Sequence, residues 1–190
     1  MNSPFIVDQT FKNKDYTKTS LPKAEYDNCT FIGCFFEGSY LSTISFLECE
    51  FINCNLANTK LKEATFKDVS FLECKMIGMP FYECNPFLFS ANFKQCNLDI
   101  AAFNNLKLTG TVFTDCSLQQ TDFSESDLTK STFGNCNLKD AIFKNTILEG
   151  TDFRTAYKLS FNPNDNRMKG AKFSESNVHG LLVVHHIIIE

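Results

Sequence analysis

The sequence predicts an all-β solenoid, in which the chain winds as a square coil with four sides of five residues each. A large apolar residue recurs at every fifth position, like residues recur at every twentieth, and all nine cysteines share one phase of the five-residue period. Neither the helical period of 3.6 nor the strand period of 2 fits a repeat of five. A chain that turns a corner every five residues does fit.

The five-residue period runs through two blocks of the chain. The first block extends from Phe11 to Phe81, and the second restarts two residues out of phase at Leu88 and continues to Phe153. We call each large apolar residue of this series a centre. The centres make about seven coils, which at the usual strand separation would give a rod on the order of 34 Å long.

A twenty-residue period sorts the centres of the second block into columns of one residue type. A solenoid requires such stacking, because each coil can bury its apolar face only against its neighbours. The period therefore predicts four sides in each coil. The first phenylalanine column is Phe93, Phe113, Phe133 and Phe153, and the leucine column beside it is Leu98, Leu118 and Leu138.

The cysteines all lie two residues before a centre, a phase that they share with Ala, Ser and Thr. We expect this position to point inward and to take small side chains. An odd number of cysteines in an inward phase favours free thiols that fill space over disulfides, and hence a cytoplasmic location. The nine are Cys29, Cys34, Cys49, Cys54, Cys74, Cys84, Cys96, Cys116 and Cys136.

The five-residue unit resembles the signature of the pentapeptide-repeat family over roughly residues 9 to 155. In that signature a small residue is followed by Asn or Asp, then by Leu or Phe, and then by Ser, Thr or Lys. The resemblance implies the right-handed quadrilateral parallel β-helix of that family. Examples are Cys54-Asn55-Leu56-Ala57-Asn58, Ala91-Asn92-Phe93-Lys94-Gln95 and Thr121-Asp122-Phe123-Ser124-Glu125.

The repeat divides the chain into three parts. Residues 1–10 form a lead-in, 11–155 form the β-helix, and 156–190 form a terminal segment. An irregularity at 82–90 interrupts the β-helix. Pro86 lies in the irregularity and removes a backbone donor, so we expect a local bulge there or a hinge that kinks the rod. Phe87 and Phe89 flank Leu88. We expect at least one of these two rings to be exposed as a contact point, and Phe87 is our candidate.

The terminal segment is expected to cap the coil, either alone or together with a dimer contact. Ser174 is a suitable N-cap for a short helix, and the alternative is a further repeat through Val178. Residues 187–189 are expected to form a short strand. The tail resembles that of the quinolone-resistance type of pentapeptide protein, which implies a homodimer through the carboxyl end. The residues proposed for the cap or dimer are Leu181, Leu182, Ile187, Ile188 and Ile189.

The sequence offers no chemistry typical of an enzyme. It contains no phosphate loop, nucleophile elbow or zinc-ligand spacing. The three histidines, His179, His185 and His186, lie in the tail, where adjacent residues on an ordered backbone point apart. We therefore expect no catalytic residues, no cofactor and no metal. We also expect no signal peptide and no membrane span.

Two functions remain open. One is a non-catalytic scaffold whose outer faces bind another protein. The other, implied by the resemblance, is a DNA mimic that binds a type II topoisomerase such as DNA gyrase and protects it from quinolones. A duplex of this length carries about 20 charges, whereas the chain has a net charge of −4 and no basic cluster that would bind nucleic acid directly. Mimicry would therefore rest on local acidic columns, namely Glu48 with Asp68 and Glu63 with Glu83.

Overall fold

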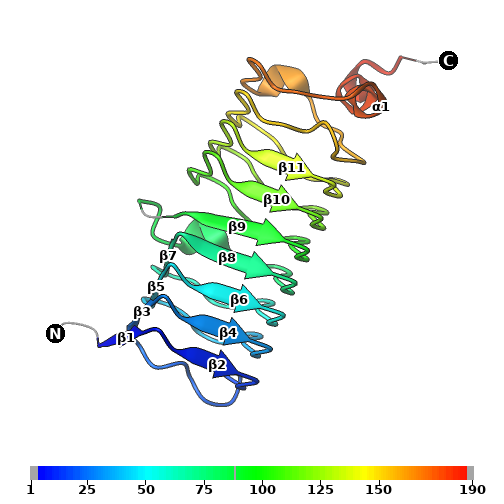
Figure 1. The fold of residues 1–190 in the computed structure, drawn as a ribbon. Coiled ribbons are helices and arrows are strands. Elements are labelled where there is room, and N and C mark those ends of the chain that lie inside the picture. The colour runs from blue at the N-terminus through cyan, green and yellow to red at the C-terminus, as the bar shows by residue number, and fades with distance from the viewer. Residues whose placement is uncertain (1–3, 88, 188–190) are drawn as a thin grey trace.

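The computed structural model describes residues 4–87 and 89–187 of the chain, which form a rod of stacked coils. The two ends of the rod carry the two ends of the chain (Figure 1). Each coil has four faces, which we number in chain order by their centres in one coil. Face 1 holds Phe31, face 2 holds Phe36, face 3 holds Leu41 and face 4 holds Phe46.

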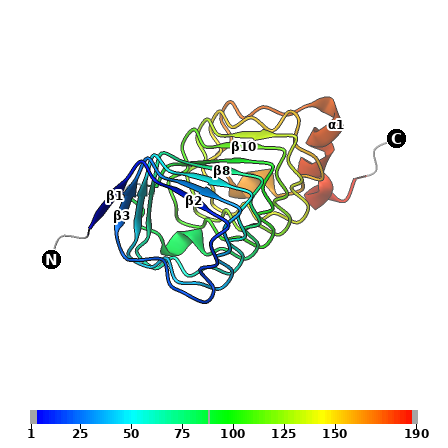
Figure 2. The same cartoon turned by 60° about the horizontal axis from the view of Figure 1, so that its bottom comes forward.

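Two parallel sheets form neighbouring faces of the rod (Figure 2). The fold is a parallel β-solenoid, as the sequence predicts. The short sheet on face 4 contains β1 (Phe5–Val7), β3 (Glu25–Asp27), β5 (Ser45–Leu47) and β7 (Thr65–Lys67). The long sheet on face 1 contains β2 (Thr10–Lys12), β4 (Thr30–Ile32), β6 (Glu50–Ile52), β8 (Val69–Leu72), β9 (Ala91–Lys94), β10 (Val112–Thr114) and β11 (Thr132–Gly134).

The register of the long sheet confirms the twenty-residue period. Phe113 pairs with Phe133, and Phe31 pairs with Phe51. The chain makes six complete turns between β2 and β11, and single bridges from Thr132 to Asp152 and on to Lys172 extend face 1 further. Faces 2 and 3 are held by isolated parallel bridges instead of strands, such as the bridge between Asn97 and Ser117.

The interior is filled by the centres and by the small residues two positions before them. All nine cysteines are buried free thiols, which confirms their inward phase. Phenylalanine rings of successive coils stack almost parallel on face 1, with ring centroids 5.1 Å apart for Phe93 and Phe113 and 5.0 Å for Phe113 and Phe133. A ladder of aromatic rings therefore runs along the rod and supplies much of its buried apolar area.

The corners require a left-handed backbone. The second residue after most centres has a positive φ, which Gly, Asn and Asp adopt most readily, and Asn or Gly holds many of these positions. At many corners a backbone bond closes a β-turn, as where the Ser39 N–H donates to the Phe36 carbonyl at 2.8 Å. The five-residue period is thus the spacing between successive left-handed residues.

The irregularity is confined to face 4. Across it Phe71 pairs with Phe93, and a bridge joins Pro80 to Ala102, so faces 1 and 3 keep their stacking while two residues are added. The long sheet runs through without a break, which favours the local bulge over the hinge. The short 3-10 helix η1 (Phe81–Glu83) precedes the bulge.

Phe89 fills the interior of this coil, and its ring packs edge-on against Phe66, Phe81 and Phe103. The sequence places the restarted period at Leu88, a residue outside the described part of the chain. Phe87 is exposed, as expected for at least one of the two rings.

The last coil ends in the short 3-10 helix η2 (Pro163–Asp165) and a terminal cap. The cap contains α1 (Glu175–Val178) and the 3-10 helices η3 (His179–Leu181) and η4 (Val183–His185). The short helix after Ser174 is confirmed, and the further repeat is not formed. The strand predicted at 187–189 falls mostly outside the described residues, and Ile187 itself lies in no strand.

Asn177 fastens this cap to the coil beneath it. Its side-chain Nδ2 donates to the carbonyls of Phe153 at 2.6 Å and Ala156 at 3.0 Å, and its Oδ1 accepts from the Ser174 N–H at 3.0 Å. Because a buried amide is costly unless its groups are bonded, this set of bonds fixes the position of the helix. Among the described residues, none of the helices has the length and apolar character needed to cross a membrane.

Candidate functional site

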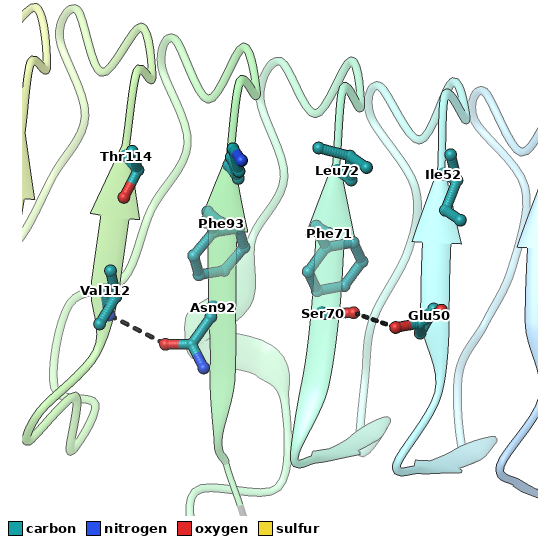
Figure 3. Close-up of a pocket in the computed structure, with 10 residues that line it drawn as sticks. Glu50, Ile52, Ser70, Phe71, Leu72, Asn92, Phe93, Val112 and Thr114 are labelled. Carbon is teal, nitrogen blue, oxygen red and sulfur yellow. Dashed lines mark hydrogen bonds between the residues drawn. The ribbon is translucent and has the colours of Figure 1, made fainter.

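An apolar groove crosses the outer surface of the long sheet. It has a volume of about 390 Å³ and spans β6, β8, β9 and β10 (Figure 3). Ile52, Leu72 and Val112 line it with apolar side chains, and the buried centres Phe71 and Phe93 lie beneath it. Outward positions of a sheet face are normally polar, so this concentration of apolar groups makes the groove a candidate contact surface.

Charged and polar groups surround the groove. Glu50 lies beside it on β6, where its carboxylate accepts a long hydrogen bond of 3.5 Å from the Ser70 hydroxyl, and Lys94 lies on β9. Asn92 accepts from the Val112 N–H at 3.0 Å. The period indicates where Ile52 and Leu72 lie, since they are twenty residues apart, but the sequence analysis did not single them out.

An acidic edge follows the corner between faces 4 and 1 in the first block. Glu48 and Asp68 follow β5 and β7 in equivalent positions one coil apart, as the sequence predicts. Three carboxylates that the sequence analysis missed lie beside Glu48 and Asp68, because they occupy neighbouring positions at the same corner of successive coils. The five residues of the acidic edge are Asp8, Asp27, Glu48, Glu50 and Asp68.

Polar side chains connect the acidic edge between coils. Asn28 donates to the Asp8 carboxylate at 2.7 Å, and the Ser90 hydroxyl donates to the Asp68 carboxylate at 2.9 Å. Lys67 on β7 lies among them as a single positive charge. The edge spans three coil steps, or about 14 Å, over which one strand of a duplex carries about four phosphates and both strands about eight. Its charge therefore matches one strand of a duplex.

The second predicted acidic pair lies elsewhere. The Glu63 N–H donates to the Glu83 carbonyl at 2.8 Å, so these two residues are stacked at the corner between faces 3 and 4. Face 4 separates them from the acidic edge. Phe87 is 93% exposed in the bulge, where its N–H donates to the Asn85 side chain at 3.1 Å. The structure thus brings Glu48 and Asp68 together with further carboxylates but leaves Glu63, Glu83 and Phe87 apart from them.

The tail residues differ in their burial. Leu181 is buried against the last coil and Leu182 is half-buried, whereas Val183, Val184 and Ile187 are exposed. Ile188 and Ile189 lie outside the described residues. Capping uses only part of the apolar tail, and an exposed strip remains at the end of the rod.

The buried Cys49 thiol is held in its protonated form. Burial raises the pKa of the Cys49 thiol from its ordinary value of 9.0 to about 12, so the thiol stays protonated at neutral pH. Its Sγ donates to the carbonyls of Tyr26 and Leu47, both at 3.3 Å. Within residues 4–87 and 89–187, no group of three His, Cys, Asp or Glu side chains is placed to hold a metal ion.

The fold defines a solenoid built of five-residue repeats whose centres and cysteines are buried in its interior. The model of the family described as the pentapeptide repeat region matches residues 24–86 and 87–153, which is more than half of the chain. The chain therefore belongs to the pentapeptide repeat family, as its five-residue signature indicates. No curated protein matches it by sequence.

Solved structures with the same kind of coil are similar to the chain at low identity. A trypsin-treated form of QnrB1, a plasmid-mediated fluoroquinolone resistance protein, is 17% identical with a TM-score of 0.46, and the match covers 99% of this chain and 98% of that one. HetL, a pentapeptide repeat protein involved in heterocyst differentiation regulation from Nostoc sp. strain PCC 7120, is 14% identical with a TM-score of 0.48, covering 94% and 88% respectively.

Proposed function

We propose that this chain is a non-catalytic, protein-binding scaffold and that the groove on the long sheet is its main binding surface. The observation that carries the proposal is the groove itself, where Ile52, Leu72 and Val112 leave apolar area partly open to solvent on the outer side of the sheet. Such a patch is stabilised when a partner covers it.

The geometry of the groove also indicates the kind of partner it suits. Apolar side chains lie on strands roughly 4.8 Å apart, so a partner segment with apolar groups at a similar spacing would contact several strands together. Glu50 and Lys94 carry opposite charges beside the apolar groups. They would favour one direction of a charged partner segment over the other.

The test is affinity capture from a lysate of the source organism, followed by mass spectrometry. The wild-type chain is compared with Leu72→Asp in the groove and with Tyr157→Asp, which makes an apolar-to-acidic change at an exposed position on face 2. We expect one protein to be retained by the wild type and by Tyr157→Asp and to be lost with Leu72→Asp. Retention by all three, after circular dichroism has shown that each is folded, would remove the groove from the proposal.

A second candidate function is DNA mimicry toward a type II topoisomerase such as DNA gyrase. The acidic edge favours it, since five carboxylates over about 14 Å have the linear charge density of one DNA strand. Glu50 belongs to both the acidic edge and the groove. A partner could therefore use both surfaces at once.

The discriminating assay is DNA supercoiling by gyrase with and without a fluoroquinolone. Mimicry through the acidic edge predicts that the chain alters the reaction and that the double variant Glu48→Lys/Asp68→Lys abolishes the effect. The control Glu63→Lys/Glu83→Lys makes the same charge change at the far corner of face 4 and is expected to retain it. If wild-type protein neither binds gyrase nor changes the reaction, this candidate is rejected, while the scaffold proposal still stands on its own test.

The exposed end of the tail completes the proposal. Val183, Val184 and Ile187 form an apolar strip beyond the buried Leu181, which suits a contact between two copies through the carboxyl end. The molecular mass in solution, measured before and after removal of residues 181–190, tests this contact. A monomer in both cases would contradict it.

A further inference from the structure

Three aliphatic side chains lie in one line along the outer surface of the long sheet. Ile32 pairs with Ile52, and Ile52 pairs with Leu72, so the three stand in consecutive coils, and each is partly exposed. We call Ile32, Ile52 and Leu72 the aliphatic column. Figure 3 shows Ile52 and Leu72 in one row and Glu50 in the row across the groove. The column therefore forms one wall of the groove and continues past it to Ile32.

A lysine stands at each end of the aliphatic column. Lys12 pairs with Ile32, and Lys94 pairs with Leu72. Both lysines are exposed, and neither takes part in the three ion pairs found between residues 4–87 and 89–187. At the usual strand separation the two lysines are roughly 19 Å apart. A segment that covers the whole column therefore meets a positive charge at both ends.

The two flanks of the column differ in charge. On the side of the acidic edge, Glu50 lies two residues before Ile52 on the same strand, and Glu48 and Asp68 follow at the corner. On the other side, the corner positions that follow the column carry a single carboxylate, that of Glu73. Complementary charges on a partner would thus be acidic at both ends and basic along one flank.

The spacing of the column favours a helical partner segment. Groups on one face of an α-helix recur every three or four residues and advance roughly 4.5 to 6 Å along its axis, close to the coil spacing of about 4.8 Å. Two such steps advance roughly 10.5 Å, and two coils advance about 9.6 Å. In an extended segment that follows the rod, groups on one side advance roughly 6.6 Å per step, so they lose register with the column within two coils.

A second copy of this chain does not suit the aliphatic column. A two-fold axis that sets all three apolar side chains of one copy opposite those of another runs either along the rod or across it. The first axis places Lys12 opposite Lys12, and the second places Lys12 opposite Lys94 and Glu50 opposite Glu50. Because like charges face each other in both arrangements, the column favours a partner of different sequence.

We infer that the aliphatic column binds an amphipathic α-helix of a partner protein. The helix carries apolar residues at i, i+3 or i+4, and i+7, acidic residues about one turn beyond them at both ends, and basic residues on the flank toward the acidic edge. Recognition would follow the helix-in-groove mode, in which apolar anchors on one helix face supply the contact. The inference rests on the proposed function, since it names the kind of segment that the groove takes.

The test uses a designed helical peptide of about 15 residues, enough to extend from Lys12 to Lys94. The peptide has Leu at i, i+4 and i+7, Glu at i−3 and i+11, Lys at i+1 and i+8 on one flank, and Ala and Gln elsewhere. Fluorescence anisotropy measures its dissociation constant with the full chain. A peptide of the same composition with Leu at every second position is the control for the helical period, and we expect the wild type to bind it at least about tenfold more weakly.

Variants of the chain test the column and its two ends separately. Ile52→Asp is expected to raise the dissociation constant at least about tenfold. Lys12→Glu/Lys94→Glu is expected to raise it roughly tenfold and to prefer a peptide with Lys in place of both terminal Glu residues. Lys60→Glu/Lys144→Glu makes the same change of charge on face 3 and is expected to bind as the wild type does. Circular dichroism checks each fold, and the exposed lysine pair keeps the test independent of Ile52→Asp.

Three results would each overturn the inference. They are equal binding of the two peptide periods by the wild type, unchanged binding by a folded Ile52→Asp, and equal behaviour of the two lysine pairs toward the two charge forms of the peptide. The proposed function fails separately, when Leu72→Asp retains every protein that the wild type captures. A partner lost with Leu72→Asp while the helical peptide is not preferred would show that the groove binds a segment of another shape.

Discussion

The two blocks of the rod form the corner between faces 4 and 1 with different side chains. In the first block the inward residue is Cys29 or Cys49, and the strands β3 and β5 precede it. In the second block it is Thr111, Ser131 or Thr151, and a backbone bond closes a β-turn instead, as from the Ser131 N–H to the Leu128 carbonyl at 3.0 Å. The short sheet accordingly ends before the second block.

The thiol and the hydroxyl bond to the same carbonyl of the coil below but at different lengths. The Cys49 Sγ lies 3.3 Å from the Tyr26 carbonyl, whereas the Ser131 Oγ lies 2.6 Å from the Leu108 carbonyl. A hydroxyl is the shorter and stronger donor. At this corner a thiol in the inward position accompanies an extended strand, and a hydroxyl accompanies a closed β-turn.

The aromatic rings also exchange faces between the blocks. Face 4 holds Tyr26, Phe46 and Phe66 in the first block and leucines in the second, whereas face 3 changes from leucine to phenylalanine. The exchange falls in one coil, where Phe81 on face 3 and Phe89 on face 4 lie with centroids 5.8 Å apart. That coil contains the two additional residues, which gives both rings room in the interior.

The largest expected effect comes from removing a ring of the first block. Phe46 lies within 5.3 to 5.8 Å of four other rings, so Phe46→Ala is expected to lower the free energy of unfolding by about 3–5 kcal/mol. Leu128→Ala on the same face of the second block is the matched control and should cost less. Urea unfolding measures both, and an equal or larger loss for Leu128→Ala would contradict this account of the first block.

At alkaline pH, stability should respond differently to substitution of Cys49 and of Ser131, which hold equivalent corners between faces 4 and 1. The pKa of Cys49 is raised by burial from 9.0 to about 12, so the folded state holds this proton while the unfolded chain releases it. The associated stability is complete below pH 9 and is lost as the pH rises to about 12.

The measurement is urea unfolding of reduced protein as a function of pH. Between those pH values, Cys49→Ser should lose less stability than the wild type by up to about 1.4 kcal/mol per pH unit. Ser131→Ala, which carries no titrating group at the equivalent corner, should follow the wild-type pH dependence. Identical profiles for the wild type and Cys49→Ser would show that this thiol ionises equally in the folded and unfolded states.

Removal of the Ser131 hydroxyl is expected to have a smaller effect on stability. Ser131→Ala removes the 2.6 Å bond to the Leu108 carbonyl and is expected to lower stability by about 1 kcal/mol. The turn should persist, because its backbone bond does not depend on the hydroxyl. Thermal unfolding measures the loss, and a variant as stable as the wild type would show that this bond contributes no net stability.

The smallest expected effect concerns the corner after face 2. Ile100 has a φ of +60° and is 59% exposed, whereas Asn58 holds the equivalent position in the first block. A branched side chain is disfavoured in this conformation, so Ile100→Asn is expected to raise stability by about 0.5–1 kcal/mol. Asn58→Ile is expected to lower it by a similar amount. Thermal unfolding checks the pair, and a shift of the same sign in both variants would refute the argument.

The sequence predicted those parts of the fold that depend on period and failed where packing decides. Five- and twenty-residue repeats identified the centres, the inward cysteines and the parallel stacking. They did not distinguish strand corners from turn corners, because both have the same length. Counting placed the restart at Leu88, which lies outside the described residues, and it did not predict that Phe89 packs among the interior rings of that coil.

The same limit applies to the surfaces. The period found Glu48 with Asp68, since they occupy one column. It missed Asp27 and Glu50, which reach the same edge only because the chain turns the corner between them. The groove was missed because Ile52 and Leu72 lie on outward positions, which the repeat leaves free to vary.

The confinement of the two additional residues to one face has a consequence for how such a chain can change over evolutionary time. Phe71 still pairs with Phe93, and Lys75 still bridges to Asn97, so the insertion shifts numbering but not alignment. Face 4 thus accommodates a change of length, while the other three faces keep the coils aligned. A short insertion at this corner therefore leaves the surfaces of the two neighbouring blocks unchanged.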